Sequence, residues 1–133
     1  MQTVALLLLI WFCASAQTIK PYLRMETEAH SGAVFNLDMD ANQRFLVSAS
    51  FDKTARVWDM HSGKLIRILR PPIGEKKEGE LLSVAISPDG SQVAVGGNGP
   101  TYGPQPIYVF DRESGAIRKV LSTGSSNAVH LNY

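Results

Sequence analysis

The sequence has 133 residues, a formal net charge of +1 and 44% hydrophobic residues. This length suits one small domain. The balanced charge offers no electrostatic basis for binding nucleic acid or an anionic membrane, so we expect neither partner. Basic and acidic residues alternate between residues 64 and 80, which indicates a solvated surface of mixed charge.

The first 16 residues are predicted to be a signal peptide. Residues 4–13 form an uncharged apolar run, and residues 14–16 are a small-x-small cleavage signal. The run is too short to cross a bilayer, which takes about 20 residues. Because residues 1–3 carry no basic side chain, a buried N-terminal strand or helix is the alternative. We expect export to the periplasm or the extracellular space, with cleavage after Ala16 and no membrane span in the mature chain.

The mature chain would contain no thiol, because Cys13 is the only cysteine and would be removed with the signal peptide. A disulfide, a cysteine-based zinc site and a cysteine nucleophile are then excluded. No two histidines are close enough in sequence to suggest a metal pair. We therefore expect no metal and no cofactor. An exported domain without disulfides fits a bacterial periplasm better than a disulfide-stapled secreted module.

Short apolar runs separated by turn residues follow from residue 30 onward, a pattern typical of β-strands. The predicted strands cover residues 33–39, 45–50, 54–59 and 64–69 in a first unit, and 81–87, 92–96, 107–111 and 116–121 in a second. The two units form an internal repeat. A shift of 47 residues aligns their first halves and a shift of 52 aligns Val57-Trp58-Asp59 with Val109-Phe110-Asp111, the extra five residues lying in the segment 98–106.

The segment 46–59, LVSASFDKTARVWD, is the most informative part of the chain. It contains two short strands around a tight turn, with His30 placed 22 residues before Asp52 and Trp58 six residues after it. This pattern resembles a WD40 repeat, one blade of a β-propeller. The resemblance implies an all-β fold: a partial β-propeller of about two four-stranded antiparallel blades, with a leading outer strand at 18–27 and a trailing strand at 128–133.

The predicted organisation follows from this repeat. The segments are a signal peptide (1–16), a linker with the outer strand (17–29), a first WD40-like blade (30–70), a loop (71–80), a second, degenerate blade (81–121) and the start of a third blade (122–133). Some exported bacterial WD40-repeat proteins carry further blades or a peptidase domain. We therefore expect the chain to be a fragment of a longer protein, in which open blade edges favour self-association.

Four polar residues of the first unit form a candidate site: His30, Ser48, Asp52 and Trp58. The resemblance implies that they make a structural hydrogen-bond network, in which each buried polar group is satisfied. The alternative is a Ser/His/Asp nucleophilic triad, which needs an exposed serine and an oxyanion hole. Ser48 lies within an apolar strand and no G-x-S-x-G motif is present. We therefore predict the structural role.

The second unit departs from this pattern. The repeat places Lys77, Val95 and Phe110 where the first unit has His30, Ser48 and Trp58. We therefore expect this blade to depend on apolar packing, with Phe110 in the tryptophan position.

A long loop at residues 98–106 is the second candidate site. Its Asn98, Thr101, Tyr102 and Gln105 are the predicted binding residues, since long loops on rigid scaffolds often carry binding. An inserted loop without a role is the alternative.

The resemblance and the predicted structural network favour a non-catalytic role: the chain is expected to be a scaffold segment that binds a protein partner. One alternative is a regulatory or substrate-binding propeller part of a multidomain enzyme whose catalytic domain lies elsewhere. A propeller hydrolase that uses surface loops is a further alternative.

Overall fold

The computed structural model describes residues 28–72, 74, 76–99 and 105–123. The predicted signal peptide, the outer strand at 18–27 and the trailing strand at 128–133 lie outside these residues. Within residues 28–123, as far as they are described, no helix is long and apolar enough to cross a membrane.

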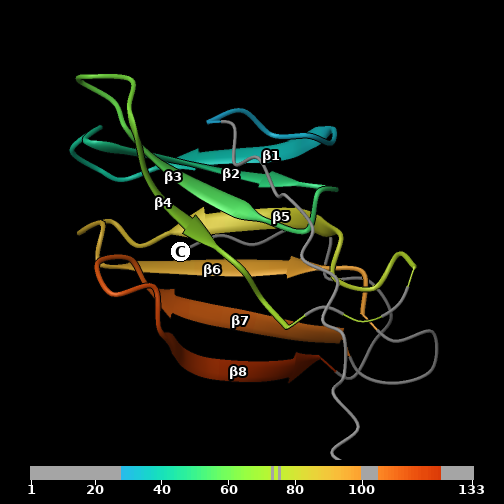
Figure 1. Cartoon of the computed structure of the whole chain (residues 1–133). Helices are drawn as coiled ribbons and strands as arrows, with labels where there is room; N and C mark the ends of the chain where they lie inside the picture. The colour runs from blue at the N-terminus through green and yellow to red at the C-terminus, as the bar shows by residue number, and fades with distance from the viewer. Residues whose placement is uncertain (1–27, 73, 75, 100–104, 124–133) are drawn as a thin grey trace, which may run out of the picture.

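Eight strands form two four-stranded sheets (Figure 1). The first sheet contains β1 (Val34–Met39), β2 (Phe45–Ser50), β3 (Ala55–Asp59) and β4 (Leu65–Leu69), and the second contains β5 (Leu81–Ile86), β6 (Gln92–Gly97), β7 (Gln105–Asp111) and β8 (Ile117–Thr123). Strands follow in sequence order within each sheet, and all neighbours are antiparallel. The all-β fold and the two predicted blades are confirmed.

The main correction to the predicted strands concerns the last two. β7 begins at Gln105 and β8 continues to Thr123, because Gln105 pairs with Thr123 and Pro106 with Ser122. The sequence assigned residues 105 and 106 to a loop because of the proline there. A proline is nevertheless tolerated at the beginning of a strand, where its missing N–H is least needed.

The internal repeat extends to irregularities of the backbone. Each sheet has a register shift early in its first strand, at Val34/Asn36 and at Leu81/Ser83. Each has another between its third and fourth strands, at Val57/Trp58 and at Val109/Phe110. Bulges at matching positions bend both sheets in the same way, so the two sheets are copies of one structural unit.

The hydrophobic core lies between the two sheets, where β5 packs against β1 and β2. Side chains alternate along each strand, so one face of each sheet points into this core. The first sheet contributes Val47, Ala49, Ala55, Val57 and Leu69, and the second contributes Leu81, Val84, Ile86, Val93, Val95 and Phe110. Side chains of β1 remain exposed, among them Leu37 with 57% of its surface accessible.

Each sheet has two kinds of end. The turns 40–44, 60–64, 87–91 and 112–116 lie at one end, here called the turn end. The described connections 51–54, 70–72, 74, 76–80 and 98–99 lie at the opposite end, here called the loop end.

Candidate functional site

The four polar residues predicted to form a network lie in contact in the first sheet. His30 precedes β1, and its Nδ1 lies 2.8 Å from Oδ2 of Asp52 while its Nε2 lies 2.7 Å from Oγ of Ser48. Trp58 Nε1 donates to the same Ser48 oxygen over 3.0 Å. A carboxylate accepts hydrogen bonds and an indole only donates them. His30 therefore donates from Nδ1 to Asp52, and its Nε2 accepts a hydrogen bond from the Ser48 hydroxyl. The chain of donors runs from Trp58 to Asp52.

Asp52 holds the tight turn between β2 and β3. Its carboxylate also accepts the backbone N–H groups of Ser31 at 3.1 Å and Thr54 at 3.0 Å, and Lys53 adopts a positive φ of 67°. Burial alone would raise the pKa of Asp52, but hydrogen bonds from the Thr54 hydroxyl, from His30 and from the Ser31 backbone hold that pKa below its usual 3.8. Asp52 therefore joins the segment before β1 to the turn.

Ser48 has little capacity for nucleophilic chemistry in this arrangement. Only 3% of its surface is accessible, and its hydroxyl already interacts with both Trp58 and His30. A catalytic serine must meet a substrate carbonyl next to oxyanion donors. This geometry favours the structural interpretation of the four residues over the triad.

In the second sheet, apolar residues take the places of Ser48 and Trp58. Val95 is fully buried and Phe110 is 1% accessible, whereas Lys77 is exposed. Phe110 pairs with Val93 as Trp58 pairs with Leu46. Phe110 therefore occupies the tryptophan position within the core, without an N–H donor.

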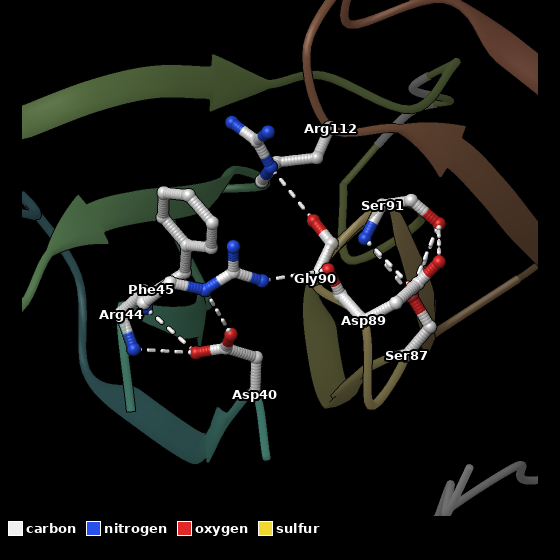
Figure 2. A network of polar contacts seen from close by, with 8 residues as sticks. All are labelled: Asp40, Arg44, Phe45, Ser87, Asp89, Gly90, Ser91 and Arg112. Atoms are coloured by element: carbon white, nitrogen blue, oxygen red, sulfur yellow. Dashed lines mark hydrogen bonds and ion pairs between the residues drawn. The ribbon is translucent and has the colours of Figure 1, made fainter. Parts of the chain in front are cut away.

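A second polar network joins the two sheets at the turn end (Figure 2). Arg44 donates from Nη2 to the Asp89 carbonyl at 2.8 Å, and Arg112 donates from Nε to the Gly90 carbonyl at 2.7 Å. The Arg112 guanidinium also lies 4.1 Å from the centroid of the Phe45 ring, a cation–π contact. Gly90 has a φ of 70°, and a Cβ there would lie 2.9 Å from Phe45, so this approach requires glycine.

Asp40 anchors the first-sheet side of this network. Its buried carboxylate accepts the backbone N–H groups of Arg44 at 2.7 Å and Phe45 at 2.8 Å, and Nε of Arg44 at 3.0 Å. Burial would raise the pKa of Asp40, but these hydrogen bonds and the Arg44 charge bring it below 3.8. Sequence reasoning treated this segment only as a turn. One signal in the sequence could have indicated the network: Asp40 directly follows a predicted strand, and Ser87 takes the equivalent position in the second unit.

The structure describes two of the four residues of the predicted binding loop, Asn98 and Gln105. Thr101 and Tyr102 lie outside the described residues. Gln105 is a buried residue of β7 and its Oε1 accepts the backbone N–H of Gly99, so its assignment to a loop was wrong. Asn98 lies at the end of β6, where its Nδ2 donates to Oε2 of Glu80 at 3.0 Å.

A pocket of about 220 Å³ lies beside Asn98 at the loop end. Its walls come from the β4–β5 segment and from the adjoining ends of β6 and β7, and they include Glu78, Glu80 and Tyr108. The sequence predicted only solvated charges here, and Lys76 and Lys77 are indeed exposed, but Glu78 and Glu80 are half-buried. In the part of the chain that the structure describes, no group of three or more His, Cys, Asp or Glu could hold a metal ion.

Two antiparallel four-stranded units that share one core, with a His-Ser-Asp-Trp network in the first, define blades of a WD40-type β-propeller. Residues 22–59 match the family model described as "WD domain, G-beta repeat". The chain therefore contains a WD40 repeat, and its described part has the fold of two blades of a WD40 β-propeller.

Among curated proteins, the chain is similar to eukaryotic translation initiation factor 3 subunit I of Neurospora crassa, with 29% identity over 84 residues. That match covers 63% of this chain and 21% of the relative. It is also similar to the denticleless protein homolog of Gallus gallus, with 40% identity over 55 residues, which are 41% of this chain and 8% of that protein. The chain thus spans about a fifth of the length of the initiation factor subunits that it matches.

Solved propellers agree on the fold. The Cps50 (Swd1) β-propeller domain of Myceliophteria thermophila superposes with a TM-score of 0.62 at 17% identity, over 78% of this chain and 30% of that one. The RRP9 WD40 repeats superpose with a TM-score of 0.58 at 22% identity, over 72% of this chain and 27% of that one.

Proposed function

We propose that the chain is a non-catalytic protein-interaction segment of a longer, exported WD40 propeller protein. The observation that carries this proposal concerns the candidate Ser/His/Asp triad: its residues are used for internal hydrogen bonds, and Ser48 is buried and bonded to both Trp58 and His30. Ser48 is therefore not available as an exposed nucleophile. The loops and turns that connect the strands are carried on rigid sheets, and such connections often form binding surfaces.

The similar proteins support the same class of function. WD40 domains mediate protein interactions, and the fungal relatives are named as subunits of a translation initiation factor, which is a role within an assembly. Export is proposed from the apolar run and cleavage signal of residues 1–16. It predicts that protein from the native host begins at Gln17, and an intact mass equal to the full 133 residues would contradict it.

Two assays on the purified chain test the function. The first measures peptidase and esterase turnover together with the melting temperature in wild type and Ser48→Ala. We expect no turnover in either protein and a lower melting temperature in the variant. Turnover that disappears in Ser48→Ala at an unchanged melting temperature would establish the hydrolase alternative instead.

The second assay tests for a stoichiometric protein partner. The tagged chain is cross-linked in its native host as wild type, as Lys76→Ala/Lys77→Ala at the loop end, and as Lys64→Ala at the turn end. We expect one partner to be recovered in a fixed ratio, and its recovery to change in only one of the two variants, because binding uses one face. Recovery of no protein in fixed ratio would contradict the interaction role.

A further inference from the structure

The pocket at the loop end combines apolar walls with acidic groups. Pro71, Pro72 and Pro106 line it together with the ring of Tyr108, and Glu78 and Glu80 also face it. Tyr108 packs against the hydrophobic core, which fixes the position of its ring. Since small-molecule sites typically measure about 300–1,000 Å³, a pocket of about 220 Å³ is suited to one side chain.

Hydrogen bonds hold the acidic wall against the end of β6. The Gly79 N–H donates to the Asn98 carbonyl at 2.6 Å, and the Asn98 N–H donates to the Glu80 carbonyl at 2.8 Å. A Cβ on Gly97 would collide with that same Glu80 carbonyl, so the close approach depends on glycine. This wall of the pocket is therefore formed before any ligand arrives, which lowers the entropic cost of binding.

The two carboxylates of the pocket are not neutralised by the described part of the chain. Neither Glu78 nor Glu80 forms an ion pair there; Glu80 accepts only the neutral Asn98 amide at its side chain. Lys53 lies close to this wall, since its Nζ donates to the Gly74 carbonyl at 3.3 Å, while Lys76 and Lys77 are exposed on the preceding turn. The wall thus presents negative charge next to apolar surface.

We propose that this pocket binds one arginine or lysine side chain of an extended segment in a partner protein. The aliphatic stem of such a side chain packs on the prolines and on the Tyr108 ring, and the cation is attracted by the ring face. The charged head forms charge-assisted hydrogen bonds with Glu78 and Glu80. This inference rests on the proposed interaction function and names the chemistry of the partner.

The test uses the isotope-labelled full chain and two blocked peptides, acetyl-Gly-Ser-Arg-Ser-Gly-amide and the same peptide with citrulline, which keeps the shape of arginine but is neutral. Amide chemical shifts are followed by NMR titration. We expect the arginine peptide to shift the amides of Gly97, Asn98 and Gly99. We expect the citrulline peptide to bind about tenfold more weakly, because its hydrogen bonds lack the charge.

Variants locate the binding energy. Glu78→Gln/Glu80→Gln should weaken the arginine peptide about tenfold, whereas Glu113→Gln, at the turn end of the second sheet, should leave it unchanged. Equal binding of the two peptides, equal binding to the double variant, or shifts confined to other residues would each overturn the assignment. The citrulline comparison uses wild-type protein, so it decides the matter even if the double variant fails to fold.

A failure of the pocket assignment can be distinguished from a failure of the proposed function. A chain that ignores both peptides but still recovers its cross-linked partner loses only the pocket assignment. Turnover that depends on Ser48 would overturn the proposed function whatever the peptides do.

Discussion

The two blades share one topology and differ in what fills their centres. The first uses His30, Ser48, Asp52 and Trp58 in a hydrogen-bonded chain, whereas the second uses Val95 and Phe110 in apolar contact with the core. Both nevertheless have the same strand order and the same bulge positions. The comparison teaches that the polar network is one of two ways to stabilise this sheet and is not required for its shape.

Both blades also keep the same turn chemistry at the turn end. Asp59 accepts the Ser62 N–H at 2.7 Å and Asp111 accepts the Ser114 N–H at 2.7 Å, each at the end of a third strand. Gly63 and Gly115 follow at positive φ angles of 69° and 74°. Since these caps survive where the network is lost, we infer that turn chemistry specifies the blade more directly than the network does.

The largest effect is expected from removing the central aromatic of each blade. Phe110→Ala should lower the free energy of unfolding by about 4 kcal/mol, because the ring is fully buried and its loss leaves a cavity. Trp58→Ala should cost about 3 kcal/mol, since Trp58 is partly exposed but also donates to Ser48. Urea unfolding of both variants gives the two values. A larger cost for Trp58→Ala would mean that the network outweighs packing.

The anchor of the inter-sheet network should show the next largest difference. Asp40→Asn should cost about 2–3 kcal/mol, because a buried charged acceptor that holds Arg44 and two backbone N–H groups is lost. Ser87 occupies the equivalent position and accepts the N–H groups of Ser91 and Gln92. Ser87→Ala should cost only about 1 kcal/mol, as expected for neutral hydrogen bonds. Equal costs in chemical denaturation would show that the Arg44 bridge adds nothing.

Equivalent positions before the first strand of each blade provide a matched pair. His30→Ala should cost about 1–3 kcal/mol, because it removes the Nδ1 partner of the Asp52 carboxylate and the Nε2 partner of the Ser48 hydroxyl, inside a site whose side chains are almost fully buried. Lys77→Ala should change stability by less than about 0.5 kcal/mol, as is usual for exposed sites. Thermal melts at one protein concentration measure both. If His30→Ala were as harmless as Lys77→Ala, the network would contribute nothing.

Much of this architecture could be predicted because the signals are local. Alternating apolar runs and turn residues located all eight strands to within a few residues, and the spacing of His30, Asp52 and Trp58 indicated one network. The start of β7 was wrong because Pro106 lies in a paired strand, and tertiary pairing overrides the local signal there.

What could not be predicted depends on contacts between the sheets. Arg44 and Phe45 meet Asp89, Gly90 and Arg112 only after both blades have folded and packed. The pocket likewise needs the β4–β5 segment to lie on the glycine backbone at the end of β6. Neither the contacts between the sheets nor the pocket produces a periodic pattern that could be recognised in a single sequence.

The smallest expected effect concerns acid. A hydrogen bond from the Ser87 hydroxyl, followed by those of the Ser91 backbone and hydroxyl, lowers the pKa of Asp89 from 3.8 to about 2. A carboxyl with a lower pKa in the folded state stabilises the protein above about pH 4, and that stability is lost as the pH falls toward 2. Asp89→Asn should therefore flatten the fall of the melting temperature in this range. An unchanged slope would show that this cap does not contribute.

The most direct test compares the blades within one molecule by native-state hydrogen exchange of wild type and His30→Ala. If the network stabilises the first blade alone, the variant should lose protection at the amides of Ser50, Lys53 and the β2–β3 pairs, while β6 and β7 keep theirs. Equal loss of protection in both sheets, or no loss around Ser50, would contradict the conclusion that the two blades are stabilised in different ways.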